Sequence, residues 1–167
     1  MKWGWDLGFG SLLGFGSWLL GFDMAKTFRL EIVSPDRQLF AADVESLVAP
    51  AHEGYLGVLA GHAPLLCVLQ SGEIAVRVDG KAQYFSTGGG FMDVQPKTVR
   101  ILADVAERLE EIDVVRAKSA LEKAVAKLAE RREGPRPSEA EVFTVLGAKT
   151  RAENRLKLAK KHGRPGF

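Results

Sequence analysis

Residues 73–84 read EIAVRVDGKAQY, and this stretch decides the fold. Its apolar side chains alternate with charged, polar or small ones before position 79, with the period of two that is expected of a half-buried strand. Asp79-Gly80 then interrupts the alternation. A type I′ turn needs positive φ at both central residues, and Asp-Gly is one of the pairs that tolerate it. The stretch therefore predicts a β-hairpin centred on this dipeptide.

Similar short runs lie on both sides of this hairpin. Residues 27–33, TFRLEIV, alternate in the same way, and Ser34-Pro35-Asp36 turns the chain after them. Further apolar or alternating runs cover residues 43–51, 64–70, 73–79, 81–87, 91–95 and 97–105, with breaks at Ser71-Gly72, Gly88–Gly90 and Pro96. Many short strands with turn signals between them are typical of a β-sandwich or barrel.

The composition changes near Glu107. Residues 107–133 are rich in Ala, Glu, Lys, Leu and Arg and lack Gly and Pro, which predicts a helix or a short lead-in followed by one. GPRP at 134–137 ends it, and Ser138 with Glu141 has the form of a capping box that starts a second helix. The expected fold class is an all-β N-terminal sandwich at 24–106, then a C-terminal antiparallel α-helical hairpin at 107–162 and a tail at 163–167.

The N-terminus differs from the rest of the chain. Residues 3–22 are almost uniformly apolar, which is long enough for a membrane-helix candidate, but the segment contains six glycines, which disfavour a stable helix. Met24 opens a sequence of ordinary globular composition. We therefore expect residues 1–23 to be an apolar extension outside the fold, with a role that the sequence leaves open.

Several kinds of chemistry have no signature in the sequence. The 167 residues contain no H-E-x-x-H, no G-x-S-x-G and no phosphate-binding loop, so no catalytic site is expected. The single cysteine, Cys67, excludes an internal disulfide and is expected to be a buried small apolar residue. His52 and His62 lack a third ligand, so no metal site is expected.

The C-terminal end is basic, with seven Lys or Arg residues against only Glu153 in residues 149–164. This surface fits a solvated helix face, an interface for an acidic protein, or nucleic-acid binding. It lacks interleaved aromatic side chains and any reading motif for nucleic acid, so no nucleic-acid partner is expected.

Two long stretches together are specific. LEIVSPDRQLFAADVESLVAPAHEGYLGVLAGHAPLL (30–66) followed by YFSTGGGFMDVQPKTVRILADVAERLEEIDVVRA (84–117) closely resembles the ε subunit of bacterial F-type ATP synthases, over roughly Met24 to Leu158. The resemblance implies a noncatalytic central-stalk (rotor) subunit of a proton-translocating enzyme. It implies that the γ subunit, the c-subunit ring and the α/β catalytic head are partners, and that the hairpin inhibits ATP hydrolysis. The implied location is peripheral, on the cytoplasmic face of the bacterial inner membrane.

The resemblance also suggests a role for residues 53–66, EGYLGVLAGHAPLL, which are too irregular for one element and too apolar for a solvated loop. In the family this side of the sandwich contacts γ and the c ring, so the implied interface residues are Glu53, Gly54, Tyr55, Gly57, His62 and Pro64. Many relatives carry an acidic residue where this chain has Tyr55. A charge pair with the ring is therefore in doubt, although the interface is not.

The second family feature is the signature I/L-D-x-x-R-A, which Ile112–Ala117 fit at every defined position. It implies that ATP is a regulatory ligand, with no cofactor required. The implied ATP-binding residues are Glu107, Asp113, Arg116, Lys123, Arg151 and Arg155. An arginine can bind phosphate through two charge-assisted hydrogen bonds, whereas Asp113 can equally be a plain helix cap. The alternative function is an independent nucleotide- or nucleic-acid-binding module with the same fold.

Overall fold

The computed structural model describes residues 27–133 and 138–163, so the expected extension at 1–23 lies outside the described residues. In chain order the strands are β1 (Phe28–Val33), β2 (Gln38–Val44), β3 (Ser46–Ala51), β4 (Gly54–Leu59), β5 (Leu65–Val78), β6 (Lys81–Val94), β7 (Thr98–Ala103) and β8 (Ala106–Arg108). The single-turn 3₁₀ helix η1 (Leu109–Glu111) and the helices α1 (Val114–Glu133) and α2 (Glu139–Lys161) follow.

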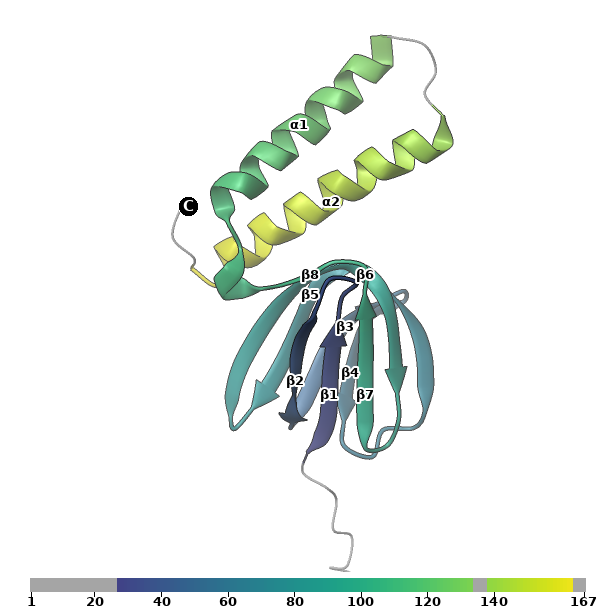
Figure 1. The fold of residues 1–167 in the computed structure, drawn as a ribbon, viewed down its shortest axis with the longest axis vertical. Coiled ribbons are helices and arrows are strands. Elements are labelled where there is room, and N and C mark those ends of the chain that lie inside the picture. Colours follow the sequence, from purple (N-terminus) through teal and green to yellow (C-terminus); the bar gives the residue numbers. More distant parts are fainter. Residues whose placement is uncertain (1–26, 134–137, 164–167) are drawn as a thin grey trace, which may run out of the picture.

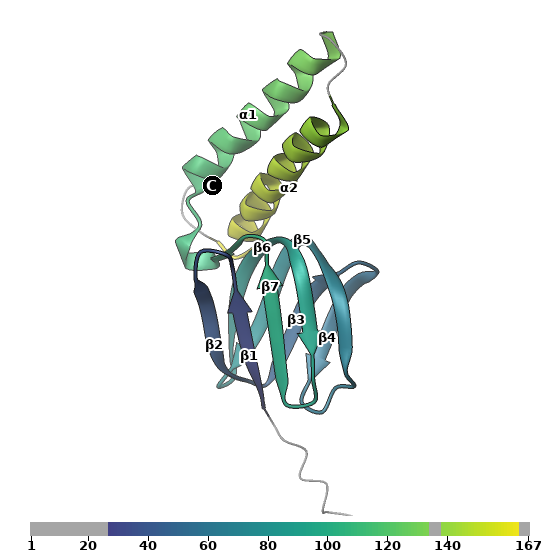
Figure 2. The same ribbon diagram turned by 45° about the vertical axis from the view of Figure 1, so that its right-hand side comes forward.

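The strands form one sheet in the order β2-β1-β7-β6-β5-β3-β4, and β8 pairs with β6. The pair β1–β7 is parallel and all other pairs are antiparallel. The sheet curls over so that its two halves face each other, and both helices lie beyond one end of it (Figures 1 and 2). Buried side chains from β1 to β7 fill the space between the halves, including Leu30, Leu47, Ile74 and Phe85, and Ala106 of β8 packs against them. The expected fold class, a β-sandwich followed by two helices, is confirmed.

The predicted hairpin is present. Val78 pairs with Lys81, and Asp79 and Gly80 have φ of 49° and 73°, the positive values that a type I′ turn requires. The pairing then continues in one register to Leu65 opposite Val94. Ser71-Gly72 and Gly88–Gly90 therefore do not end strands, and the prediction of four short strands here was wrong.

Glycine geometry explains this continuity. Gly89 and Gly90 have φ of 118° and 133°, and a Cβ on Gly90 would lie 2.1 Å from the carbonyl oxygen of Leu102 on β7. The glycines let β6 approach β7 this closely without leaving the sheet.

Two other strand predictions need correction. Residues 43–51 form no single run, because β2 ends at Val44 and β3 begins at Ser46. Residues 54–59, expected to be irregular, form β4, which pairs with β3 at one edge of the sheet. An edge strand has only one neighbour and exposes most of its side chains, so its apolar pattern is weak.

A short lead-in does precede the first helix, since β8 and η1 lie before α1. Ser138 and Glu141 form the predicted capping box, in which each side chain accepts a hydrogen bond from the other residue's backbone N–H. α2 packs against β5 and β6. Its residues Leu158 and Ala159 join Leu109, Ile112 and Val114 in a small apolar cluster separate from the sandwich core.

Candidate functional site

Few polar contacts hold α2 on the sheet. Lys161 Nζ donates to both carboxylate oxygens of Glu73 on β5, at 3.1 and 3.0 Å. This hydrogen bond and the charge of Glu73 raise the pKa of Lys161 above its ordinary value of 10.5. The His162 ring stacks on Tyr84 of β6 with 3.7 Å between centroids. Asn154 donates to Ser71 Oγ at 2.5 Å.

A pocket of about 210 Å³ lies where the hairpin meets the sandwich, and we call it the junction pocket. It contains three of the predicted ATP-binding residues, each from a different element: Glu107 from β8, Arg116 from α1 and Arg155 from α2. Arg155 Nε donates to Glu107 Oε2 at 2.6 Å, and both side chains are partly buried. The Arg116 side chain forms no ion pair within residues 27–133 and 138–163.

The other predicted ATP-binding residues take different positions. Asp113 Oδ1 accepts a hydrogen bond from the backbone N–H of Arg116 at 2.9 Å, so Asp113 caps α1. Arg151 packs over β6, where a Cβ on Gly88 would lie 2.9 Å from its Cδ. Lys123 is exposed about two turns along α1 from Arg116 and does not line the pocket.

Part of this pocket has no signal in the sequence. Ser34, Asp36 and Arg37, from the turn between β1 and β2, also line it. Arg37 forms an ion pair with Glu111 of η1. The sequence marks these residues only as a turn, and no local signal places them beside the hairpin.

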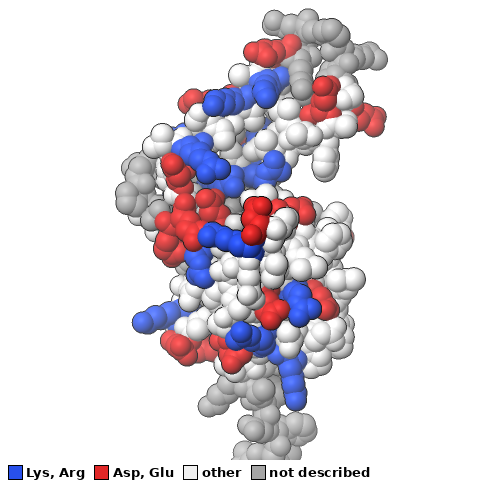
Figure 3. All heavy atoms as spheres, viewed as in Figure 1, with Lys and Arg blue, Asp and Glu red and all other residues white. Residues whose placement is uncertain are grey.

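The pocket is small, and three arginines and three carboxylates line it, so any preference for an anion depends on Arg116. At about 210 Å³ it is smaller than the roughly 300–1,000 Å³ of most small-molecule sites. Arg116 is the guanidinium free to bind phosphate, because Arg37 and Arg155 already pair with glutamates. In Figure 3, Lys and Arg side chains gather on the lower hairpin and beside a group of Asp and Glu at its junction with the sheet.

The predicted interface residues lie at the two ends of the edge strand β4, with Tyr55 at the end near α2 and His62 and Pro64 beyond the other end. Gly54, Tyr55 and Gly57 are on β4, and Gly54 has φ of 125°, which favours glycine. Tyr55 is 64% exposed. Glu53 is in the turn before β4, and His62 and Pro64 are in the loop before β5; the structure leaves Glu53 and Pro64 exposed.

Residues 65–102 also supply an apolar surface that the sequence does not predict. Val68 pairs with Phe91, and Phe91 pairs with Leu102, so the three lie side by side across β5, β6 and β7. They are 51%, 53% and 51% exposed, and nearby Leu66 is 71% exposed. A contiguous exposed apolar group of this kind is typical of a protein-binding surface. We call Leu66, Val68, Phe91 and Leu102 the apolar row.

Residues 52–67 contain the two histidines for which no metal site was expected and Cys67, which was expected to be buried. His52 lies beside Gln70, and a ring nitrogen of His62 lies 2.7 Å from the carbonyl oxygen of Ala63. The part of the chain that the structure describes contains no group of three or more His, Cys, Asp or Glu residues that could hold a metal ion. Cys67 is partly rather than fully buried, and this burial raises the pKa of its thiol.

Comparison with known proteins agrees with this architecture. A family model described as "ATP synthase, Delta/Epsilon chain, beta-sandwich domain" matches residues 27–109. The ATP synthase epsilon chain of Solibacter usitatus is 46% identical over 138 residues, which cover 83% of this chain and 99% of the relative. The ATP synthase epsilon chain of Desulforamulus reducens is 41% identical over 136 residues, with 81% and 99% covered. The chain belongs to the ATP synthase epsilon chain family.

A solved structure of the Euglena gracilis mitochondrial ATP synthase, comprising OSCP, F1 and c-ring, contains a chain with the same fold. The TM-score is 0.59 and the identity 27%, and the match covers 84% of this chain and 82% of that one. As an ATP synthase epsilon chain, the protein is a noncatalytic stalk subunit of a membrane-associated complex, which confirms the expected family and the expected place in the stalk. None of the described helices is long and apolar enough to cross a membrane.

Proposed function

We propose that the sandwich couples the γ subunit to the c-subunit ring at the cytoplasmic face of the membrane, and that the hairpin is a movable brake on ATP hydrolysis. In this proposal the hairpin leaves the sandwich to reach the α/β catalytic head. ATP binding to the junction pocket favours the docked hairpin.

The observation that carries this proposal is the small docking interface of the hairpin. It consists of a few polar contacts, the His162–Tyr84 stack and an apolar cluster of five buried side chains, whereas the sandwich has a separate and much larger core. Separation of the hairpin therefore exposes little apolar surface and leaves the sandwich core intact.

Charge supports a target on the catalytic head. In the docked state Arg155 and Lys161 pair with Glu107 and Glu73, and Arg151 packs on β6. Undocking would free these three cationic side chains for acidic surfaces of a partner. The basic face predicted from the sequence is thus partly turned toward the sandwich when the hairpin is docked.

The proposed ATP response rests on the junction pocket, because its residues come from β8, α1, α2 and the β1–β2 turn. A polyphosphate at Arg116 would touch elements that are close only in the docked state. Such a ligand shifts the equilibrium toward that state by its difference in affinity. Arg155 would reach the phosphate only by leaving Glu107.

Coupling to the rotor rests on two surfaces of the sandwich. The apolar row is the proposed contact with γ, because an exposed apolar group on a rigid sheet fits a permanent partner. His62 and Pro64, in the loop at the end of β4 away from α2, are the proposed contact with the c ring.

The test uses the assembled enzyme and the isolated chain. Ending the chain before Gly134 should raise ATP hydrolysis by the complex while leaving γ bound; unchanged hydrolysis would contradict the brake. Calorimetric titration of the isolated chain with ATP should show saturable binding that Arg116→Ala abolishes and that releases no phosphate. Lys118→Ala is the matched control on the same helix, because Lys118 does not line the pocket.

A further inference from the structure

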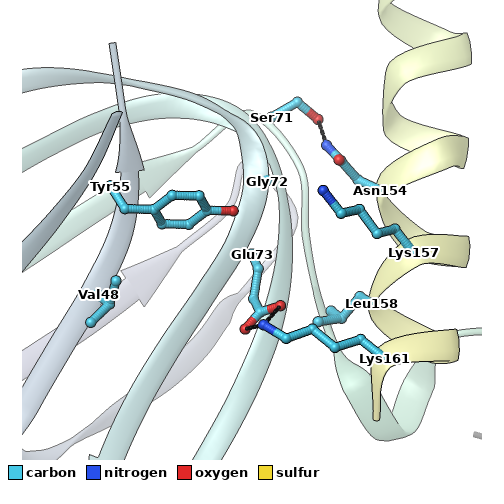
Figure 4. Close-up of a pocket in the computed structure, with 9 residues that line it drawn as sticks. All are labelled: Val48, Tyr55, Ser71, Gly72, Glu73, Asn154, Lys157, Leu158 and Lys161. Atoms are coloured by element: carbon cyan, nitrogen blue, oxygen red, sulfur yellow. Dashed lines mark hydrogen bonds and ion pairs between the residues drawn. The ribbon is translucent and has the colours of Figure 1, made fainter. Parts of the chain in front are cut away.

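A second and larger pocket lies between α2 and the sheet (Figure 4). Its volume of about 500 Å³ falls within the roughly 300–1,000 Å³ typical of small-molecule sites. The strands contribute Val48, Tyr55, Ser71, Gly72 and Glu73, and the helix contributes Asn154, Lys157, Leu158 and Lys161. None of these residues belongs to the predicted ATP-binding set.

The two pockets use different faces of α2. The second pocket takes Asn154, Lys157, Leu158 and Lys161. Lys157 and Leu158 lie three and four positions after Asn154, and Lys161 lies four and three positions after them, so the four share one helix face. Arg155 lies on the neighbouring face and lines the smaller pocket. A ligand in one pocket therefore does not occupy the other.

The polar groups of the second pocket leave one positive charge uncompensated. Both carboxylate oxygens of Glu73 accept from Lys161 Nζ, so these two charges neutralise each other. Lys157 forms no ion pair with any residue that the structure describes, and its ammonium group lies on the pocket side of α2 in Figure 4. The Tyr55 hydroxyl points across the pocket toward the helix and donates to no acceptor in the described parts of the chain.

Apolar surface completes the lining. Val48 and Leu158 contribute aliphatic side chains on opposite walls, and the Tyr55 ring contributes an aromatic one. Gly72 lies between the walls, where a Cβ would come within 2.8 Å of Pro50 and 3.5 Å of the Tyr55 hydroxyl. The glycine thus keeps β5 close to β3.

We propose that this pocket binds a small organic anion, with its charged group at Lys157 and the Tyr55 hydroxyl and its apolar body between Val48 and Leu158. An ammonium and a phenol both donate hydrogen bonds to carboxylate and to phosphate oxygens, so either anionic group fits. Because one wall is the sheet and the other is α2, the anion binds only while the hairpin is docked. It therefore stabilises the docked hairpin by mass action, separately from the junction pocket.

The full chain is titrated with phenyl phosphate in one experiment and with phenylacetate in another. Binding is measured by NMR as shifts in the signals of ¹³C-methylated lysines. We expect saturable binding of at least one probe, and which probe binds decides between phosphate and carboxylate. Lys157→Gln should weaken this binding about tenfold, since it removes a charge-assisted hydrogen bond. Lys160→Gln, which removes the same charge from an exposed site on α2 outside the pocket, should leave it unchanged.

Three further results complete the test. Binding should persist in Arg116→Ala, so a failed ATP site and a failed second pocket can be told apart. The bound probe should increase amide-exchange protection at residues 152–161. Absence of saturable binding by both probes, equal weakening by Lys157→Gln and Lys160→Gln, or binding without added protection of α2 would overturn the proposal. Circular dichroism of both lysine variants shows whether the fold is intact.

Discussion

Replacing Gly90 by alanine should destabilise the sandwich more than a change at any ordinary turn glycine. Gly90 has φ of 133°, and its new Cβ would lie 2.1 Å from the carbonyl oxygen of Leu102 and 2.8 Å from Ala103 Cα. Both neighbours are backbone atoms, so β6 and β7 have to separate locally. Backbone strain costs about 1–3 kcal/mol and each lost ladder hydrogen bond about 1 kcal/mol, which gives roughly 3–5 kcal/mol.

Urea denaturation followed by far-UV circular dichroism measures this loss. With an m-value of about 2 kcal/mol/M, the midpoint should fall by roughly 1.5–2.5 M. Gly80→Ala is a matched control, because Gly80 has φ of 73° but no atom within 4 Å of its Cβ position. It should lose only about 1–2 kcal/mol from left-handed strain. If Gly90→Ala lost no more than Gly80→Ala, the close approach of β6 and β7 would not be the cause, and the reasoning would fail.

Three further predictions concern the hairpin and the apolar row. Ser138→Ala removes one half of the capping box and should lower helix stability by about 1 kcal/mol, measured as a lower thermal midpoint at 222 nm. The raised pKa of Lys161 means that its pairing with Glu73 stabilises docking below pH 10.5 and is lost as the pH rises through the folded-state pKa. Exchange protection of α2 should therefore fall above about pH 10.5 more in the wild type than in Lys161→Gln, and an equal fall in both would show that the Lys161–Glu73 pair is not its cause. Phe91→Asp should abolish copurification with γ while leaving the melting curve nearly unchanged, since the side chain is already 53% exposed, and retained γ would place the interface elsewhere.

The sequence predicts best those features that depend on neighbouring residues. Asp79-Gly80 specifies its own turn, and Ser138 with Glu141 specifies the start of α2, because each signal acts within four residues. The order of strands before helices follows from the change in composition near Glu107. These features give the fold class without knowledge of distant contacts.

The features that were wrong or missed depend on contacts between distant segments. In the sequence Gly90 indicates the end of a strand. In the structure it is the point at which β6 closely approaches β7. Arg37 reaches the junction pocket only because the fold places the β1–β2 turn beside η1. Its ion-pair partner Glu111 is 74 positions away in the sequence. The apolar row likewise exists only after Val68, Phe91 and Leu102 are paired across three strands.

The pairing of β8 with β6 has a mechanical consequence. β7 and β8 pair with β6 in the same register, so the segment that carries the hairpin is hydrogen-bonded along β6 at positions 85–87. Arg108 anchors the end of this segment by donating to the carbonyl oxygen of Leu39 and lying over the rings of Phe40 and Phe85. A force applied to the helices is thus transmitted to β6, whose 14 residues run through both halves of the sandwich. If the hairpin undocks as proposed, it therefore stays tethered to a strand that is hydrogen-bonded on both sides, to β5 and to β7 with β8.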